Sequence, residues 1–273
     1  MVLNLILLSI GLLGLFFGGE WLIKGASRLA RSFGVSALIV GLTVVSFGTS
    51  LPELIVSLNA ALRGSSDIAI GNVVGSNIAN IGLILGVTGL IYPIVVRRSL
   101  LQRDMPIMLG VMFIAYLMIL DGEISRIDGG VLFLGLLMFM GLMVLIAWRE
   151  NHKPLSATEQ AALEAEEGPA IKKSQRGREV VRLVAGLAVL VIGARLTVDN
   201  AIDIARIIGV SELVIGITLV ALGTSLPELA ASGIAAMRHQ SDIAIGNVLG
   251  SNIFNVLSIL GITALVKPIT VNP

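Results

Sequence analysis

Long, nearly unbroken apolar stretches separated by short polar segments dominate the chain. A helix of about 20 apolar residues is long enough to cross the roughly 30 Å hydrocarbon core of a bilayer. The pattern therefore predicts eight membrane-spanning helices, at Val2–Ile23, Val35–Leu62, Ile68–Val96, Met105–Leu120, Gly129–Trp148, Val180–Val198, Val210–Met237 and Ile243–Val266.

The composition agrees with this pattern. Hydrophobic residues make up 55% of the 273 and charged residues 14%, a balance far from that of soluble globular domains. We therefore expect an all-α integral membrane protein whose surroundings are the lipid bilayer. The chain contains no cysteine, which excludes disulfides and thiolate metal sites. A net charge of +1 gives no indication of nucleic-acid binding, and the sequence does not define an oligomeric state.

Two segments of the chain are nearly the same sequence. Gly41 to Thr88 and Gly216 to Thr263 align without a gap at an offset of 175 residues, with 31 identities in 48 positions. Both copies carry GTSLPEL, then SDIAIGNV, then GSN. Duplicated halves with helix-breaking Gly and Pro inside apolar spans are typical of secondary transporters.

The distribution of charge indicates that the two copies are inverted in the membrane. Basic residues are enriched on the cytoplasmic side of membrane proteins, and an external amino terminus places 14 of the 19 Lys and Arg residues inside. The first half then holds five spans, so the second copy crosses in the opposite direction. We expect a multi-pass protein of the plasma (inner) membrane, with a first repeat at 1–150, a cytoplasmic linker at 151–178 and a second repeat at 179–273.

The same offset predicts that the second repeat is incomplete. After Arg98 the first half continues with two more spans, whose counterparts would follow Pro273. We therefore expect eight helices of a ten-helix architecture, with the last two missing.

A glutamate lies in each copy of the GTSLPEL motif. An ionisable group within a membrane span is costly, so its default interpretation is functional. Gly and Pro weaken the helix at this point and free backbone carbonyls as ligands, and the neighbouring hydroxyls add oxygen atoms. The predicted site residues of this motif are Glu53, Thr49 and Ser50 with helix-breaking Gly48 and Pro52, and Glu228, Thr224 and Ser225 with Gly223 and Pro227.

A second polar stripe follows each motif, with a spacing of four residues on one helical face. It consists of Asn72, Ser76 and Asn80 and of Asn247, Ser251 and Asn255, while Asn77 and Asn252 are better explained by helix packing. The combined donors are all oxygen, which suits hard cations such as Ca²⁺ better than soft transition metals. Two ionised glutamates supply a charge of −2, which one Ca²⁺ or two or three Na⁺ can meet, and protons are further competitors.

The paired GTSLPE and GNVxGSN strings resemble the two alpha repeats of the sodium/calcium exchangers, within the calcium/cation antiporter superfamily. The resemblance covers nearly the whole chain and implies a ten-helix inverted-repeat fold in which spans one and six slide against a fixed core. It implies that Ca²⁺ is held by Glu53 and Glu228 with the carbonyls of Thr49 and Thr224. Na⁺ would use those acids together with Ser50, Ser225, Ser76, Ser251, the carbonyls of Ser46 and Ala221, and Asn80 and Asn255 at the middle position.

Two features of these strings bear on the coupling ion. The middle position has asparagine in both copies, which resembles the potassium-independent exchangers. Proton/calcium exchangers of the superfamily typically have a Glu-His pair where this chain has Gly75-Ser76 and Gly250-Ser251. The resemblance therefore favours sodium over protons.

We expect a secondary antiporter that exchanges Na⁺ for Ca²⁺ and that is not an enzyme and needs no cofactor. Three alternatives remain open at this stage. A cation channel would use the same acids as a selectivity constriction, and an intramembrane enzyme would use them as a catalytic dyad. An exchanger of protons or of another divalent cation would use the same scaffold.

Overall fold

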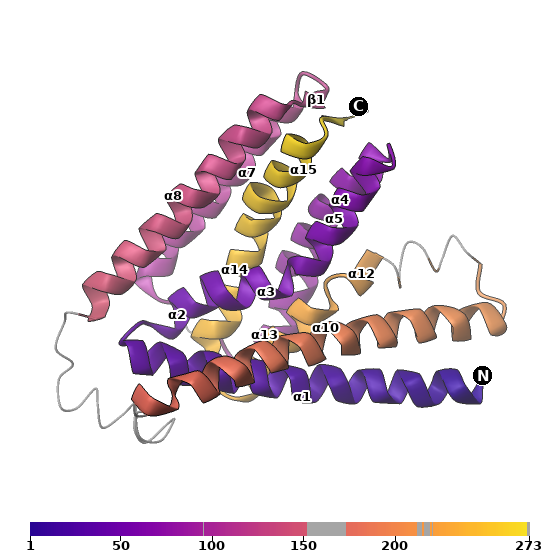
Figure 1. Ribbon diagram of the computed structural model, residues 1–273, viewed down its shortest axis with the longest axis horizontal. Helices are drawn as coiled ribbons and strands as arrows, with labels where there is room; N and C mark the ends of the chain where they lie inside the picture. The colour runs from indigo at the N-terminus through magenta and orange to yellow at the C-terminus, as the bar shows by residue number, and fades with distance from the viewer. Residues whose placement is uncertain (95, 152–172, 212–214, 216–218, 220, 272–273) are drawn as a thin grey trace.

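The computed structural model describes the chain apart from residues 95, 152–172, 212–214, 216–218, 220 and 272–273. It is almost entirely helical, as expected. Two long helices, α1 (Val2–Phe33) and α10 (Arg176–Ile207), lie side by side along one end of a bundle formed by the other helices (Figure 1).

The first half contains helices interrupted by short π-helical turns. In chain order its elements are α1, α2 (Ala37–Val40), η1 (Gly41–Val45), α3 (Ser46–Thr49), α4 (Leu51–Leu62), α5 (Ser66–Ala79), η2 (Asn80–Ile84), α6 (Leu85–Ile91), η3 (Leu100–Asp104), α7 (Met105–Ile119), β1 (Glu123–Ile124) and α8 (Arg126–Asn151). η1, η2 and η3 are π-helical.

From α12 onward, the described part of the second half repeats the order of the helices that carry the duplicated motifs. Its elements are the short η4 (Lys173–Gln175), α10, α12 (Ala221–Gly223), α13 (Leu226–Met237), α14 (Ser241–Phe254), the π-helical η6 (Asn255–Leu260), α15 (Gly261–Val266) and β2 (Ile269–Thr270). Among the described residues, six helical segments are long and apolar enough to span a membrane, and the bent pair from Ala37 to Leu62 makes a seventh.

The seventh predicted span, Val210–Met237, is described only in part, and its longest described portion is the shorter apolar helix α13. Most of the predicted linker also lies outside the described residues. Its last part is helical, because α10 already begins at Arg176. The first span is longer than predicted: α1 continues past Ile23 to Phe33 and ends at Gly34, which adopts a left-handed conformation with φ of 64°.

Small residues allow α1 and α10 to pack closely. A Cβ atom on Gly11 would lie 2.9 Å from the carbonyl oxygen of Gly193, and one on Gly18 would lie 2.9 Å from that of Gly186. Backbones that approach this closely through glycine are typical of packed membrane helices. The two helices are antiparallel, because the side chain of Arg176 donates to Ser32 at one end and Asn4 donates to Asp203 at 3.4 Å at the other.

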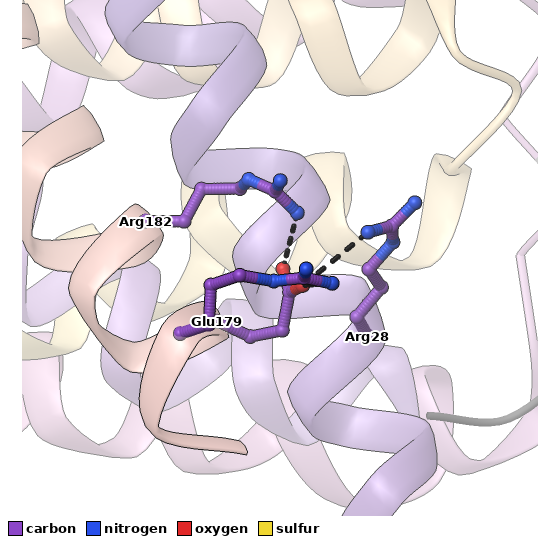
Figure 2. A network of polar contacts seen from close by, with 4 residues as sticks. Arg28, Glu179 and Arg182 are labelled. Atoms are coloured by element: carbon purple, nitrogen blue, oxygen red, sulfur yellow. Dashed lines mark hydrogen bonds and ion pairs between the residues drawn. The ribbon is translucent and has the colours of Figure 1, made fainter. Parts of the chain in front are cut away.

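A buried acid strengthens the same contact. The side chain of Glu179 on α10 has no exposed surface, and Arg28 of α1 contacts its Oε1 at 3.3 Å while Arg182 contacts its Oε2 at 2.5 Å (Figure 2). Several hydrogen bonds from arginine offset the cost of burying a carboxylate. The network therefore ties α1 and α10 together near one end of the pair.

The second copy of the repeat lies at the centre of the bundle. In the most apolar part of Ser241–Val266, 89% of residues are buried, whereas the figure for Ser66–Ile91 is 33%. α14 and α15 pack against η1, α4 and α8. The two-residue strands β1 and β2 pair antiparallel beside the end of α15.

Candidate functional site

Both GTSLPEL motifs lie where a helix is broken. α3 ends at Thr49 and α4 begins at Leu51, with a bend of 44° at this break. In the other copy α12 ends at Gly223 and α13 begins at Leu226. Pro52 and Pro227 lie in the first turn of α4 and α13, where the missing N–H of proline costs no helical hydrogen bond. The break predicted from the sequence is therefore present in each half.

The two glycines of the motif lie differently with respect to the breaks: Gly223 ends α12 and so borders its break. Gly48 lies inside α3 rather than at the break, which falls at Ser50. A Cβ on Gly48 would lie 2.7 Å from a methyl of Leu187, and one on Gly223 would lie 2.9 Å from a methyl of Val198. Both contacts are with α10, so these glycines also let the broken helices approach that helix.

The two halves exchange hydrogen bonds at the glutamates. The hydroxyl of Ser50 donates to Oε1 of Glu228 at 3.1 Å, and the hydroxyl of Ser225 donates to Oε1 of Glu53 at 3.3 Å. Both glutamates are about 1% exposed and lie in the first turn of their helices, where the positive end of the helix dipole favours a carboxylate. The halves are thus related by an approximate twofold axis with one glutamate on each side.

Asn72 and Asn247 support the broken helices. The Asn72 amide donates to the Glu53 carbonyl oxygen at 3.1 Å and to Ser57 at 2.8 Å. Asn247 makes the matching bonds, to the Glu228 carbonyl at 3.4 Å and to Ser232 at 2.9 Å.

The remaining amide oxygens of this pair are also used. The hydroxyl of Thr224 donates to Oδ1 of Asn72 at 3.4 Å, and that of Thr49 donates to Oδ1 of Asn247 at 3.2 Å. The stripe predicted to offer oxygen atoms therefore divides. Asn72 and Asn247 hold the glutamate-bearing turns in place, and the open oxygen atoms come from the positions that follow.

A set of buried polar atoms at the site has no hydrogen-bond partner within the described part of the chain. Buried polar groups are almost always paired in proteins, so unpaired ones require an explanation. The set is nearly symmetrical between the halves: Oε2 of Glu53 and Glu228, Oγ of Ser76 and Ser251, both amide atoms of Asn80, and Oδ1 of Asn255. Except for one amide nitrogen, these atoms are oxygen acceptors that a cation can bind.

The helices carrying the middle asparagines change geometry at these residues. Asn80 begins the π-helical turn η2, and Asn255 begins η6. π-helical turns occur frequently at functional sites, because the extra residue displaces the backbone and its side chains. Nothing in the alternation of apolar residues indicates these turns, so sequence reasoning missed them.

Asn77 and Asn252 connect the two copies, in agreement with the packing role predicted for them. Asn77 donates to the carbonyl oxygen of Asn252 at 3.5 Å, and Asn255 donates to Oδ1 of Asn77 at 3.0 Å. Asn77 and Asn252 are equivalent residues at the offset of 175, so this contact lies near the twofold axis.

The carbonyl ligand expected at Ser46 is already engaged within its own chain segment. The Ser46 carbonyl oxygen already accepts from the Ser50 amide at 3.0 Å and from the Thr49 hydroxyl at 3.3 Å. Ala221 is the first residue of α12.

Ser258 is a further polar residue that was not singled out from the sequence. It lies with Ser50 on a small cavity also lined by Phe47, Leu51, Leu54, Phe254 and Ile259. Its counterpart in the first copy is Leu83, and this loss of symmetry between the copies was the available signal.

The arrangement defines a class of protein. Two carboxylates, hydroxyls and amide oxygens converge between inverted repeats on broken helices, which is the construction of a secondary transporter site for cations. The atoms of this set without hydrogen-bond partners are, apart from one amide nitrogen, oxygen atoms, which suit oxygen-preferring cations.

Comparison with known proteins identifies the family. The sequence profile described as sodium/calcium exchanger protein matches residues 3–145 and 179–273. The chain belongs to the sodium/calcium exchanger family, whose members transport cations.

Individual relatives cover nearly the whole chain. The sodium/calcium exchanger MaX1 of Methanosarcina acetivorans is 35% identical over 98% of this chain and 84% of its own length. The inner membrane protein YrbG of Escherichia coli is 42% identical over 100% of this chain and 83% of its own length. A solved structure of the sodium-calcium exchanger NCX_Mj superposes with a TM-score of 0.83 at 35% identity, covering 99% of this chain and 85% of that one.

Proposed function

We propose that the protein is a secondary active antiporter that exchanges Na⁺ for Ca²⁺ by alternating access, with Glu53 and Glu228 forming one shared cation site. The observation that carries this proposal is the symmetrical set of buried oxygen atoms without partners, which includes one oxygen of each glutamate. A bound cation would satisfy these atoms and offset the cost of two ionised carboxylates in a low-dielectric interior.

The donor chemistry supports Ca²⁺ and Na⁺ as the transported ions. Both accept carboxylate, hydroxyl and carbonyl oxygen, and both can neutralise the charge of −2 that the glutamates carry. Ca²⁺ requires six to eight oxygen atoms, and in our assignment Thr49 and Thr224 contribute carbonyls from the ends of their broken helices. Na⁺ would use the serines Ser50, Ser225, Ser76 and Ser251, so the two ions share ligands and exclude each other.

We further propose that the amino terminus lies outside and that the linker at 151–178 is cytoplasmic. Helix ends that this topology assigns to the same side of the membrane are in contact. Asn4 donates to Asp203 on one side, and Arg97 donates to Asp242 on the other. The basic residues enriched on the second side make it the cytoplasmic one.

Ion flux in sealed vesicles tests the function. Vesicles loaded with Na⁺ should take up ⁴⁵Ca²⁺ when diluted into Na⁺-free medium, and vesicles loaded with K⁺ should not. Glu53→Gln and Glu228→Gln should each abolish this uptake, while Glu123→Gln, at an exposed acid on β1, should leave it unchanged. Unchanged uptake in both site variants contradicts the assignment.

The same vesicles separate the other functions. Uptake that needs no opposing Na⁺ gradient favours a channel, and uptake driven by a pH gradient favours proton coupling. Proton coupling is physically possible at this site, because a proton can also neutralise a buried carboxylate.

A further inference from the structure

An ion pair joins α1 to the end of α13 on one side of the glutamate site. Arg238, directly after α13, donates Nε to Oε1 of Glu20 at 2.6 Å and Nη2 to its Oε2 at 2.5 Å. The Glu20 side chain is only 9% exposed, and Lys24, one turn further along α1, contacts the same carboxylate at 2.9 Å. A bidentate pair of arginine and carboxylate combines a strong interaction with a fixed geometry.

The helices are in direct contact at this ion pair. A Cβ atom on Gly19 would lie 2.4 Å from Cδ1 of Ile234, so α1 rests on α13 with no space between them. Ala231 and Ala235 on α13 are buried in the same apolar cluster as Leu22 and Ile23 of α1. α1 and the glutamate-bearing helix α13 are therefore tightly packed on this side of the site.

The inverted repeat has equivalent positions on the opposite side of the glutamate site, and the charged residues at those positions differ. At the offset of 175, Glu20 corresponds to Arg195, Lys24 to Asp199 and Arg238 to Arg63. Within the described part of the chain, the ion pair of Arg195 is a contact of 3.8 Å with Asp199 on its own helix, and the Arg195 side chain is 84% exposed. In the described parts of α10 and α4, no packing comparable to that of α1 on α13 is present.

We propose that Glu20 and Arg238 are positioning residues of the transport cycle that keep this side of the site closed and make the two access states unequal in population. The inference rests on the proposed alternating-access function. In an inverted repeat, the opposite state requires α1 to leave α13 and α10 to approach α4. That movement breaks the Glu20–Arg238 attraction and brings Arg195 toward Arg63, which repel each other.

The other large ionic network does not have this effect. Glu179 joins α10 to Arg28 of α1 (Figure 2), so it lies within the helix pair and stays intact when the pair moves against the rest of the bundle. Among the described residues, Glu20–Arg238 is the only salt bridge that connects the helix pair α1 and α10 with a helix that carries Glu53 or Glu228. With the proposed topology, the closed side is cytoplasmic.

Distances between spin labels test the proposal directly, because the chain has no native cysteine. One labelled pair, Trp21→Cys with Met237→Cys, reports the closed side. The equivalent pair, Leu196→Cys with Leu62→Cys, reports the opposite side. Each pair is measured in the whole chain in liposomes without an ion gradient.

Arg238→Glu should lengthen the Trp21–Met237 distance, because a carboxylate at position 238 would repel Glu20. The double variant Glu20→Arg with Arg238→Glu should restore it, which a merely disturbed fold would not do. Glu123→Gln, at an exposed acid on β1 outside both helix contacts, serves as the control that leaves both distances unchanged. Arg63→Glu should shorten the Leu196–Leu62 distance, because it creates the missing attraction to Arg195 on the other side.

Transport should change in parallel. The apparent affinity for Ca²⁺ presented from the Glu20 side should rise about three- to tenfold in Arg238→Glu, because a larger fraction of molecules is open to that side. Unchanged distances in folded Arg238→Glu, or failure of the charge swap to restore them, overturns the proposal. If the protein exchanges Na⁺ for Ca²⁺ but the spin-label distances do not respond, only this inference fails. If vesicles show no Na⁺-driven Ca²⁺ uptake, the proposed function fails, and the spin-label distances still report the effect of the ion pair.

Discussion

The two copies of the repeated segment have nearly the same sequence but very different surroundings. SDIAIGNV opens both α5 and α14, and a π-helical turn follows both, at Asn80 and at Asn255. Yet 89% of the most apolar part of Ser241–Val266 is buried, against 33% for Ser66–Ile91. α8 covers the second copy, and in the described structure no helix occupies the equivalent place on the first.

The comparison separates what each repeated motif determines by itself, its hydrogen bonds, from what the rest of the chain determines, its burial. Hydrogen bonds inside the site match between the copies within a few tenths of an ångström, because each motif carries its own donors and acceptors. Burial differs because it depends on helices from elsewhere in the chain. Substitutions at equivalent positions should therefore have equal effects where both residues are equally buried, as at Ser50 and Ser225, and unequal effects where their burial differs.

The largest difference is expected at the glycine pair Gly261 and Gly86. A Cβ on Gly261 would lie 3.1 Å from the backbone of Phe133 on α8, whereas nothing described lies within 4 Å of one on Gly86. Gly261→Leu should lower the free energy of unfolding by about 3 kcal/mol or prevent folding, since overpacking of this kind forces the backbone to shift. Gly86→Leu should leave the melting temperature in detergent unchanged or raise it. Equal melting temperatures for the two variants would contradict the burial difference.

The serine pair tests the symmetrical part of the comparison. Ser50→Ala and Ser225→Ala each remove one hydrogen bond to the glutamate of the other half. Hydrogen bonds to charged groups contribute about 1.5–3 kcal/mol, so each variant should raise the KM for Ca²⁺ at least about tenfold. Initial rates of Na⁺-driven uptake measure this. An effect of one serine without the other would show that the halves contribute unequally.

A smaller and graded difference is expected at the supporting asparagines. Asn247 is buried, while Asn72 is half-buried, so water can replace part of the hydrogen bonding lost at Asn72 and less at Asn247. Asn247→Ala should lower the free energy of unfolding by about 1 kcal/mol more than Asn72→Ala, since unpaired buried partners carry the larger cost. Chemical denaturation of the two variants in matched detergent compares them, and the reverse order would show that the burial of the two residues does not determine the loss.

Much of the fold followed from the sequence because membrane spans and broken helices have strong local signals. The apolar stretches predicted the long helices, and Pro52 and Pro227 predicted the breaks in their first turns. The offset of 175 residues paired Glu53 with Glu228. These inferences needed only local patterns and one internal comparison.

The remaining features depend on contacts across the chain. Ser50 and Ser225 each donate to the glutamate of the other half, and Asn72 and Asn247 support the glutamate-bearing turns. These hydrogen bonds depend on which helices face each other in the folded protein. Gly48 was predicted at a helix break, and the structure places it inside α3 with Leu187 of α10 close to it, a contact that no sequence pattern indicates. The ion pair of Glu20 and Arg238 joins residues 218 positions apart, and no sequence spacing indicates it.

The central claim is that Glu53 and Glu228 form a single site for which Ca²⁺ and Na⁺ compete. Equilibrium binding of ⁴⁵Ca²⁺ to the purified protein, titrated with NaCl at constant ionic strength, tests it most directly. The account predicts that Na⁺ displaces Ca²⁺ from the wild-type protein. It also predicts that Glu53→Gln and Glu228→Gln each weaken Ca²⁺ binding by more than about 100-fold, since each removes one of two buried charged ligands. Na⁺-sensitive Ca²⁺ binding of wild-type affinity in either variant would contradict it.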